Sequence, residues 1–253
     1  MLAALIISSC APPPSSIDNM VTGGHRSGDS AVTSKNIDAI INNPERPGLA
    51  TGWGAERNSE ISYTSFVRAS SKPAGTDAIF YNDAEGIKAM AGSRERVGAM
   101  QTAAGSLVEW GIKGGIGNLP AFKDYGYGRR LVTASKGGSY IIVVKNRSKS
   151  ALEIVASVDG LDVMDGKTAS FSKRGYIVDP GETLEIDGFR TSQSKVAAFE
   201  FSSVSNSYAN LKHGDTRNVG VIGLAVFTQK GVNPWTTYEA ERRNSASPFA
   251  VAP

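Results

Sequence analysis

Residues 139–190 read SYIIVVKNRSKSALEIVASVDGLDVMDGKTASFSKRGYIVDPGETLEIDGFR, and this stretch decides the fold. Short apolar runs recur in it, separated by the turn dipeptides Asp159-Gly160, Asp165-Gly166, Pro180-Gly181 and Asp187-Gly188. Short runs with closely spaced turn signals are typical of antiparallel strands. The sequence therefore predicts an all-β protein built as an antiparallel β-sandwich.

The predicted sandwich covers residues 129–228, close to the usual size of about 100 residues. Its strands are expected at Arg130–Ala134, Tyr140–Lys145, Leu152–Val158, Gly175–Val178, Thr183–Ile186, Val196–Phe201 and Val219–Phe227. Leu152–Val158 places apolar residues at every second position, as a strand with one buried face does. Val219–Phe227 is almost entirely apolar, which predicts a central strand covered on both faces.

Residues 51–128 form a second β-rich segment, expected to extend the sandwich or to build a small companion sheet. Strands are predicted at 61–67, 77–83 and 107–112, a short helix or loop follows the second of them, and 92–105 is expected to be a loop. In the tail, residues 229–253, Thr236 and Glu239 have the spacing of a helix capping box, which predicts one short helix.

The N-terminus reads MLAALIISSCAPPPSS, and Ile7-Ser8-Ser9-Cys10 is similar to a bacterial lipobox. Residues 1–10 are interpreted as part of a lipoprotein signal and Cys10 as the lipidated residue. The apolar run is too short to span a bilayer, which takes about 20 residues, and no Lys or Arg precedes it. Residues 11–50 are rich in Ser, Gly, Asn and Pro and are expected to be a flexible tether. Ala11 after the cysteine favours the outer membrane.

Composition excludes several classes of function. The net charge of +3 comes from basic residues scattered singly or in pairs, and nucleic-acid binding would require a basic stripe or patch. Cys10 is the only cysteine, so neither an intramolecular disulfide nor a cysteine metal site is expected. The two histidines, His25 and His213, make a zinc site or a histidine-based mechanism improbable. No cofactor is predicted.

Asp159, Asp162 and Asp165 lie three residues apart in VDGLDVMDG and are the sharpest candidate site. Carboxylates gathered in one short loop can bind calcium, although the spacing is not that of an EF-hand. Asp-Gly pairs also make tight turns, and Asp side chains bind their own backbone there. Turns are the favoured interpretation, with calcium as the alternative.

Other candidates for chemistry are weaker, and no catalytic residue is assigned. His213, with Asp215 two residues on, could serve as a base, but no nucleophile elbow accompanies it and it is expected in a polar loop. Glu109 and Glu200 could belong to a glycosidase carboxylate pair, yet alternation predicts that both face outward.

Aromatic and basic residues suggest two further roles. Phe122, Tyr125 and Tyr127, or alternatively Trp53, could form a carbohydrate platform, although packing in a core or interface is the commoner role of such residues. Arg174 and Arg190 each lie beside an aromatic residue and a glycine. They are expected to tie turns to backbone carbonyls or to the aspartates of the VDGLDVMDG loop.

The phrases VASVDGLDVMDG, RGYIVDPG, IDGFR, VAAFEF and NVGVIGLAVF resemble those of a family of bacterial secreted proteins and lipoproteins with no established activity. The resemblance implies export and a β-rich fold, and it assigns no catalytic residue. We therefore expect a cell-envelope lipoprotein that is a non-enzymatic binding or structural module. Its expected partners are the membrane, through the lipid, and a protein or glycan, not nucleic acid. The alternative is a hydrolase that acts on a polysaccharide through a carboxylate pair.

Overall fold

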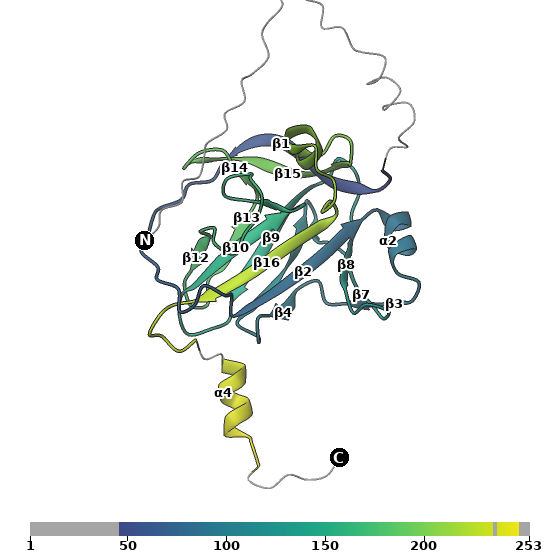
Figure 1. Ribbon diagram of the computed structural model, residues 1–253. Helices are drawn as coiled ribbons and strands as arrows, with labels where there is room; N and C mark the ends of the chain where they lie inside the picture. Colours follow the sequence, from purple (N-terminus) through teal and green to yellow (C-terminus); the bar gives the residue numbers. More distant parts are fainter. Residues whose placement is uncertain (1–45, 235–236, 248–253) are drawn as a thin grey trace, which may run out of the picture. The chain divides into compact units, whose positions relative to one another are not determined.

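The structure is a computed structural model that describes residues 46–234 and 237–247. Two β-sheets face each other around one apolar core (Figure 1). Large buried side chains from both sheets fill this core, among them Trp110, Tyr140 and Phe199 from the first sheet and Tyr81 from the second. The predicted all-β sandwich is confirmed.

The first sheet combines strands from distant parts of the chain. In spatial order it contains β1 (Leu49–Asn58), β15 (Lys195–Ser203), β9 (Ser139–Asn146), β5 (Val108–Gly114) and β4 (Gln101–Ala103). Three shorter strands pair beside this path: β13 (Thr183–Ile186) with β9, β14 (Gly188–Arg190) with β15, and β6 (Gly117–Asn118) with β5. Gly188 thus lies in a strand, and Asp187-Gly188 is not the turn that the sequence predicted.

The second sheet carries the candidate site. In spatial order it contains β11 (Leu161–Asp162), β10 (Leu152–Val158), β16 (Val221–Thr228), β2 (Gly75–Asn82), β8 (Arg130–Thr133), β7 (Ala121–Asp124) and β3 (Arg94–Val97), with β12 (Tyr176–Val178) beside β10. β2 and β8 run parallel, so the sandwich is not purely antiparallel. A long connection between β2 and β8 makes this possible, because parallel neighbours need a crossover.

The strongest strand predictions hold in detail. Leu152, Ile154, Ala156 and Val158 point into the core and are at most 1% exposed. β16 lies between β10 and β2, the central position that its continuous apolar run predicted, but it is not covered on both faces, because Gly223 and Ala225 line an open groove on its outer face. The outward side chains of these strands are small or covered, and this determines the shape of the sheet's outer face.

The boundary expected between residues 128 and 129 does not separate two structural parts. β5 pairs with β9, β1 pairs with β15, and β2 pairs with β16, so both sheets contain strands from each side of it. Residues 51–128 therefore extend the sandwich and form no companion sheet. In residues 51–128 alternation identified β2 and β5, but it carries no information about which strand pairs with which.

Two local expectations were wrong. The strand expected at 61–67 is irregular, and the strand in this region is β1, which ends at Asn58. Residues 92–105 contain β3 and β4 instead of one loop. β1, β3 and β4 have little apolar alternation, and it is backbone pairing with β15, β7 and β5 that makes them strands.

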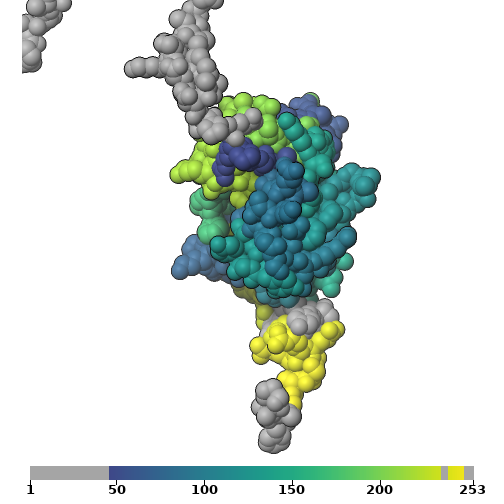
Figure 2. Space-filling model, turned by 90° about the vertical axis from the view of Figure 1, so that its right-hand side faces the viewer, coloured from purple at the N-terminus to yellow at the C-terminus, as the bar shows by residue number. Residues whose placement is uncertain are grey.

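Three short helices are described. α2 (Ala84–Met90) follows β2, and the Asp83 side chain caps it by accepting a hydrogen bond from the Gly86 amide at 2.7 Å. α3 (Tyr208–His213) replaces the polar loop expected around His213. α4 (Thr237–Asn244) is the helix predicted in the tail. Figure 2 views the protein from the side where α2, β3, β7 and β8 lie, and blue and teal atoms cover most of that face.

A buried ion-pair cluster holds two loops against the outer face of the second sheet. Glu153 of β10 is completely buried, although its alternation points it outward. Its carboxylate accepts hydrogen bonds from Arg68 Nε at 2.7 Å and from the Gly175 amide at 2.9 Å, and Arg174 Nε lies 3.2 Å away. The Arg68 guanidinium also lies 3.6 Å from the centroid of the Phe227 ring. The loops around residues 59–69 and 163–175 therefore cover this end of the sheet.

Candidate functional site: two hollows beside β2

The candidate site lies where half of β2 lacks a second neighbour. β16 pairs with residues 75–80 of β2, whereas β8 pairs only with Ile79–Asn82. In the described chain, Gly75–Ala78 is therefore an edge strand on its β8 side. The Asp77 carboxylate accepts the Ala78 amide hydrogen at 2.9 Å there. Two hollows adjoin at this edge, because Asp77 and Ala78 line both of them.

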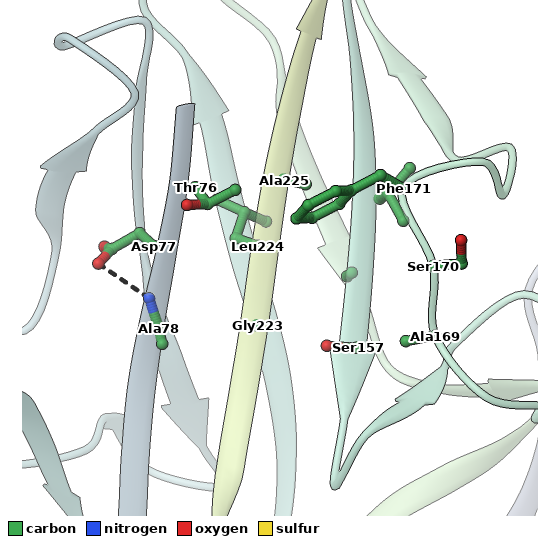
Figure 3. A pocket seen from close by; sticks show the side chains of 12 residues that line it. Thr76, Asp77, Ala78, Ser157, Ala169, Ser170, Phe171, Gly223, Leu224 and Ala225 are labelled. Atoms are coloured by element: carbon green, nitrogen blue, oxygen red, sulfur yellow. Dashed lines mark hydrogen bonds between the residues drawn. The ribbon is translucent and has the colours of Figure 1, made fainter. Parts of the chain in front are cut away.

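The first hollow, the apolar groove, crosses the outer face of β10, β16 and β2 with a volume of about 610 Å³ (Figure 3). Its floor consists of two cross-strand rows of mostly small residues: Ser157, Gly223 and Ala78, then Val155, Ala225 and Thr76. Even a Cβ on Gly223 would lie only 2.6 Å from the Ser157 hydroxyl. Phe171, which is 54% exposed, reaches across β10 toward Ala225 and forms one wall.

The second hollow, the polar pocket, has a volume of about 380 Å³ and a different lining. Lys123, Arg129 and Arg130 contribute three positive charges, and Asp77 contributes the one negative charge. Neutral polar and aromatic side chains complete the wall: Gln101 and Thr102 from β4, and Tyr127 from the β7–β8 turn. The polar pocket thus combines hydrogen-bonding groups, positive charge and an aromatic ring, which the apolar groove does not.

Arg130 is the most deeply placed cation of the polar pocket, with a side chain 9% exposed. Its Nη2 donates to the Trp110 carbonyl at 2.9 Å, and its Nη1 lies 3.5 Å from Asp77 Oδ2. The same Asp77 oxygen accepts the Trp110 indole N–H at 2.6 Å. Burial lowers the pKa of Arg130 to about 10, opposed by the Asp77 charge. Its buried Nε has no hydrogen-bond partner in the described structure.

Arg129 is held rigidly at the rim of the polar pocket. Its Nε and Nη2 donate to Asp124 Oδ2 at 3.0 and 2.8 Å, and Nη2 also donates to the Met90 carbonyl at 2.8 Å. Hydrogen bonds from Arg129 lower the pKa of Asp124. The guanidinium carbon lies 4.6 Å from the centroid of the Tyr127 ring. Lys123, in contrast, is exposed and forms no ion pair with any described residue.

Of the four aromatic candidates for a platform, only Tyr127 lines the polar pocket. Tyr127 lines it and is 81% exposed. Tyr125 is 59% exposed and donates its hydroxyl to Glu95 at 2.8 Å, and Phe122 lies under the Arg94 guanidinium at 5.4 Å. Trp53 does not belong to the platform, because its ring packs 4.6 Å from that of Tyr208 in another part of the fold.

The three candidate aspartates have separate environments. Asp159 and Gly160, both with positive φ, form the two-residue turn that joins β10 to β11. Asp162 accepts the Met164 amide within its own loop, and its buried Oδ2 has no partner, which fits a pKa raised to about 6 by burial. Asp165 pairs with Lys173. No group of three or more metal-ligating side chains occurs in the residues that the structure describes.

Asp159 joins the two sheets through a buried hydrogen-bond chain. Its Oδ1 accepts the Tyr81 hydroxyl at 2.7 Å, and its Oδ2 accepts the Thr51 amide at 2.7 Å. The Thr51 hydroxyl lies 2.8 Å from the Tyr81 oxygen and 2.6 Å from that of Tyr140. The Gly220 amide also donates to Oδ1 at 2.9 Å. Asp159 thus connects strands of both sheets.

The remaining catalytic candidates do not converge. His213 Nε2 lies 2.9 Å from the Gly166 carbonyl oxygen, and Asp215 pairs with Arg217, which lowers its pKa to about 2. Glu109 lies opposite Lys145 and Glu200 opposite Ser139, six residues apart along β9. At about 3.3 Å per residue their backbones are about 20 Å apart, too far for the ~5–10 Å of a glycosidase pair.

Arg174 and Arg190 tie loops to backbone carbonyls, as expected, rather than to the aspartates. Arg174 Nη2 donates to the Phe66 carbonyl at 2.7 Å, and Arg190 Nη1 donates to the Ser59 carbonyl at 2.7 Å. Arg190 also donates to the Tyr176 hydroxyl at 3.2 Å. These contacts explain why residues 59–67 follow the sheet surface without forming a strand.

Sequence reasoning missed most of the polar pocket. Three aromatic candidates and the Arg129-Arg130 pair lie within residues 122–130. This proximity in sequence was the one available signal of a common site. Asp77, Gln101 and Thr102 come from β2 and β4, and strand pairing alone brings them there. Cys10 and residues 11–45 of the expected tether lie outside the described residues. Leu49 and Ala50 do not belong to a tether, because they are buried at the start of β1.

No model of a known family, no curated protein and no solved structure matches the chain. In the described part of the chain, no helix is long and apolar enough to cross a membrane.

Proposed function

We propose that the protein is a lipid-anchored module of the bacterial cell envelope that binds a glycan in the polar pocket without cleaving it. One observation carries the proposal: the exposed Tyr127 ring stands at a hollow lined by Gln101, Thr102 and Lys123. Sugars present apolar ring faces edged by hydroxyl groups. An exposed aromatic ring beside hydrogen-bonding side chains complements both features.

The carboxylates at the pocket support binding without cleavage. A glycosidase places two carboxyl groups on either side of the scissile bond. Asp77 is the one carboxylate among the residues that line the polar pocket. Both of its oxygens already accept hydrogen bonds, from Ala78 and Trp110. Binding therefore agrees better with this chemistry than the alternative of hydrolysis.

The apolar groove is less suited to be the primary site. Asp77 is the one charged residue among the twelve that line it, and the rest of its surface is small or apolar. Ligand sites usually add a few placed polar groups to such a surface. The groove offers Asp77 and the hydroxyls of Thr76, Ser157 and Ser170, whereas the adjoining polar pocket adds cationic side chains and an amide.

Isothermal titration calorimetry with neutral and acidic hexasaccharides tests the proposal. We expect wild-type protein to bind at least one of them, and Tyr127→Ala to weaken that binding about tenfold, since a stacked ring contributes about 1.5 kcal/mol. Tyr63→Ala is the matched control, because Tyr63 is 79% exposed but outside the polar pocket. If Tyr127→Ala leaves the affinity unchanged, the proposed site is wrong. If the protein releases new reducing ends from the oligosaccharide, the hydrolase is favoured.

A further inference from the structure

The charges of the polar pocket do not cancel, and the excess positive charge indicates the charge that a bound glycan should carry. Arg130 lies beside Asp77, and Arg129 forms an ion pair with Asp124. The Lys123 ammonium group remains, with no carboxylate partner among the described residues. Three cations and one carboxylate thus line the hollow, which leaves its lining with excess positive charge. Glu95, the cross-strand neighbour of Lys123, does not line the hollow, and its carboxylate accepts the Tyr125 hydroxyl.

The two arginines add donors that their protein partners do not use. Arg129 Nη1 makes no hydrogen bond in the described structure, where the hydrogen bonds of that side chain all come from Nε and Nη2. Asp77 lies as far as 3.5 Å from Arg130 Nη1, so the pair is long for a charge-assisted hydrogen bond. The lowered pKa of Arg130 has the same origin, namely a buried cation that Asp77 compensates only in part.

We infer that the ligand is an acidic glycan, whose sugar ring stacks on Tyr127 and whose carboxylate binds at Lys123 beside the two arginines. This inference rests on the proposed function and specifies in addition that the bound sugar is negatively charged. A monoanion fits better than a phosphate, because a single cation lacks a partner. Tyr127 lines the same hollow and approaches Arg129, so one uronic-acid residue can contact both the ring and the cations.

A pair of probes that differ only in charge tests the inference. Hexagalacturonate carries a carboxylate on each ring, and its methyl ester keeps the rings but loses the charge. We expect wild-type protein to bind the acid at least tenfold more tightly than the ester at low ionic strength. The difference should shrink at 1 M salt, where the screening length falls to about 3 Å.

Lys123→Gln should remove this preference while leaving binding of the ester unchanged. Lys149→Gln is the matched control, because Lys149 is exposed and lies outside the polar pocket. Tyr127→Ala should weaken both probes. An unchanged melting temperature establishes that each variant is folded.

The two proposals fail in different ways. Equal affinity for acid and ester, or a preference that survives Lys123→Gln, overturns the acidic glycan but leaves a glycan site. If neither probe nor any neutral hexasaccharide binds, the proposed function fails and the inference fails with it.

Discussion

At the residue scale, Asp159 shows how one side chain can serve both local and long-range structure. Its positive φ of 53° suits an Asp-Gly hairpin turn, which the sequence predicted. Its carboxylate meanwhile accepts hydrogen bonds from Tyr81, Thr51 and Gly220, which no local pattern reveals. These contacts come from residues more than sixty positions away in sequence.

Asp159 should make stability depend on pH. Burial raises its pKa from 3.8 to about 6, so the folded state holds the proton more tightly than the unfolded chain. The resulting stabilisation is complete below about pH 4 and is lost as the pH rises through 6, by at most about 1.4 kcal/mol per pH unit. Asp159→Asn cannot ionise, so the free energy of unfolding of wild type relative to this variant should fall between pH 4 and 7.

Urea denaturation at several pH values measures this difference. Asp159→Asn should also be less stable by about 1–3 kcal/mol. The reason is that one carboxylate oxygen, which accepts hydrogen bonds, is replaced by an amide nitrogen, which cannot accept them. Asp179→Asn, at an exposed position, is the control and should behave as wild type. A wild-type-minus-variant difference that is constant with pH would contradict the assignment.

At the element scale, the success of sequence reasoning depended on where each strand lies in the sheets. β10 and β16 are central and have strong apolar patterns, so both were predicted within a few residues. β1, β3 and β4 are edge or short strands whose sequences are mostly polar or small, and they were missed or misplaced. Edge strands bury little side-chain surface, so composition is a weak guide to them.

The candidate site was only partly predictable for the same reason. Phe122, Tyr125 and Tyr127 were recognised as a possible platform because they lie close together in sequence, but sequence does not show which aromatic rings are exposed. The pocket beside them depends on β8 ending its pairing with β2 at Ile79, which leaves Asp77 and Ala78 at an edge. Register of this kind follows from the whole sheet and not from either strand.

The buried Glu153 should be the strongest single connection between β10 and its covering loops. Glu153→Gln keeps the shape but removes the charge that faces Arg68 and Arg174, and breaking a buried pair costs about 3–5 kcal/mol. Urea denaturation should show this loss, and hydrogen exchange should show faster opening of residues 163–175. Glu185→Gln is the matched control, since its pair with Lys113 is exposed and worth at most about 1 kcal/mol. Equal effects of the two substitutions would contradict the role of Glu153.

At the scale of the whole molecule, the interleaved sheets predict that the sandwich folds as one unit. A fragment of residues 129–228 would lack β1, β2 and β5, the partners of β15, β16 and β9. It would expose the inner faces of its strands, so we expect poorly dispersed amide resonances. Residues 46–247 should instead unfold in one transition. A well-folded 129–228 fragment would restore the domain boundary that the structure does not support.

The proposed anchor connects this unit to a membrane through Cys10. Each buried methylene contributes about 0.8 kcal/mol of membrane affinity, so several acyl chains would hold the protein firmly. A signal peptide needs a basic region, so a lysine-containing leader placed before Met1 supplies it in the test. Expressed this way in a Gram-negative bacterium, the protein should fractionate with the outer membrane, and Cys10→Ser should release it. Ser15→Ala, in the expected tether, should stay membrane-bound. If Cys10→Ser and the unsubstituted protein fractionate alike, a lipid on Cys10 does not locate the protein, while the glycan site on the sandwich would be unaffected.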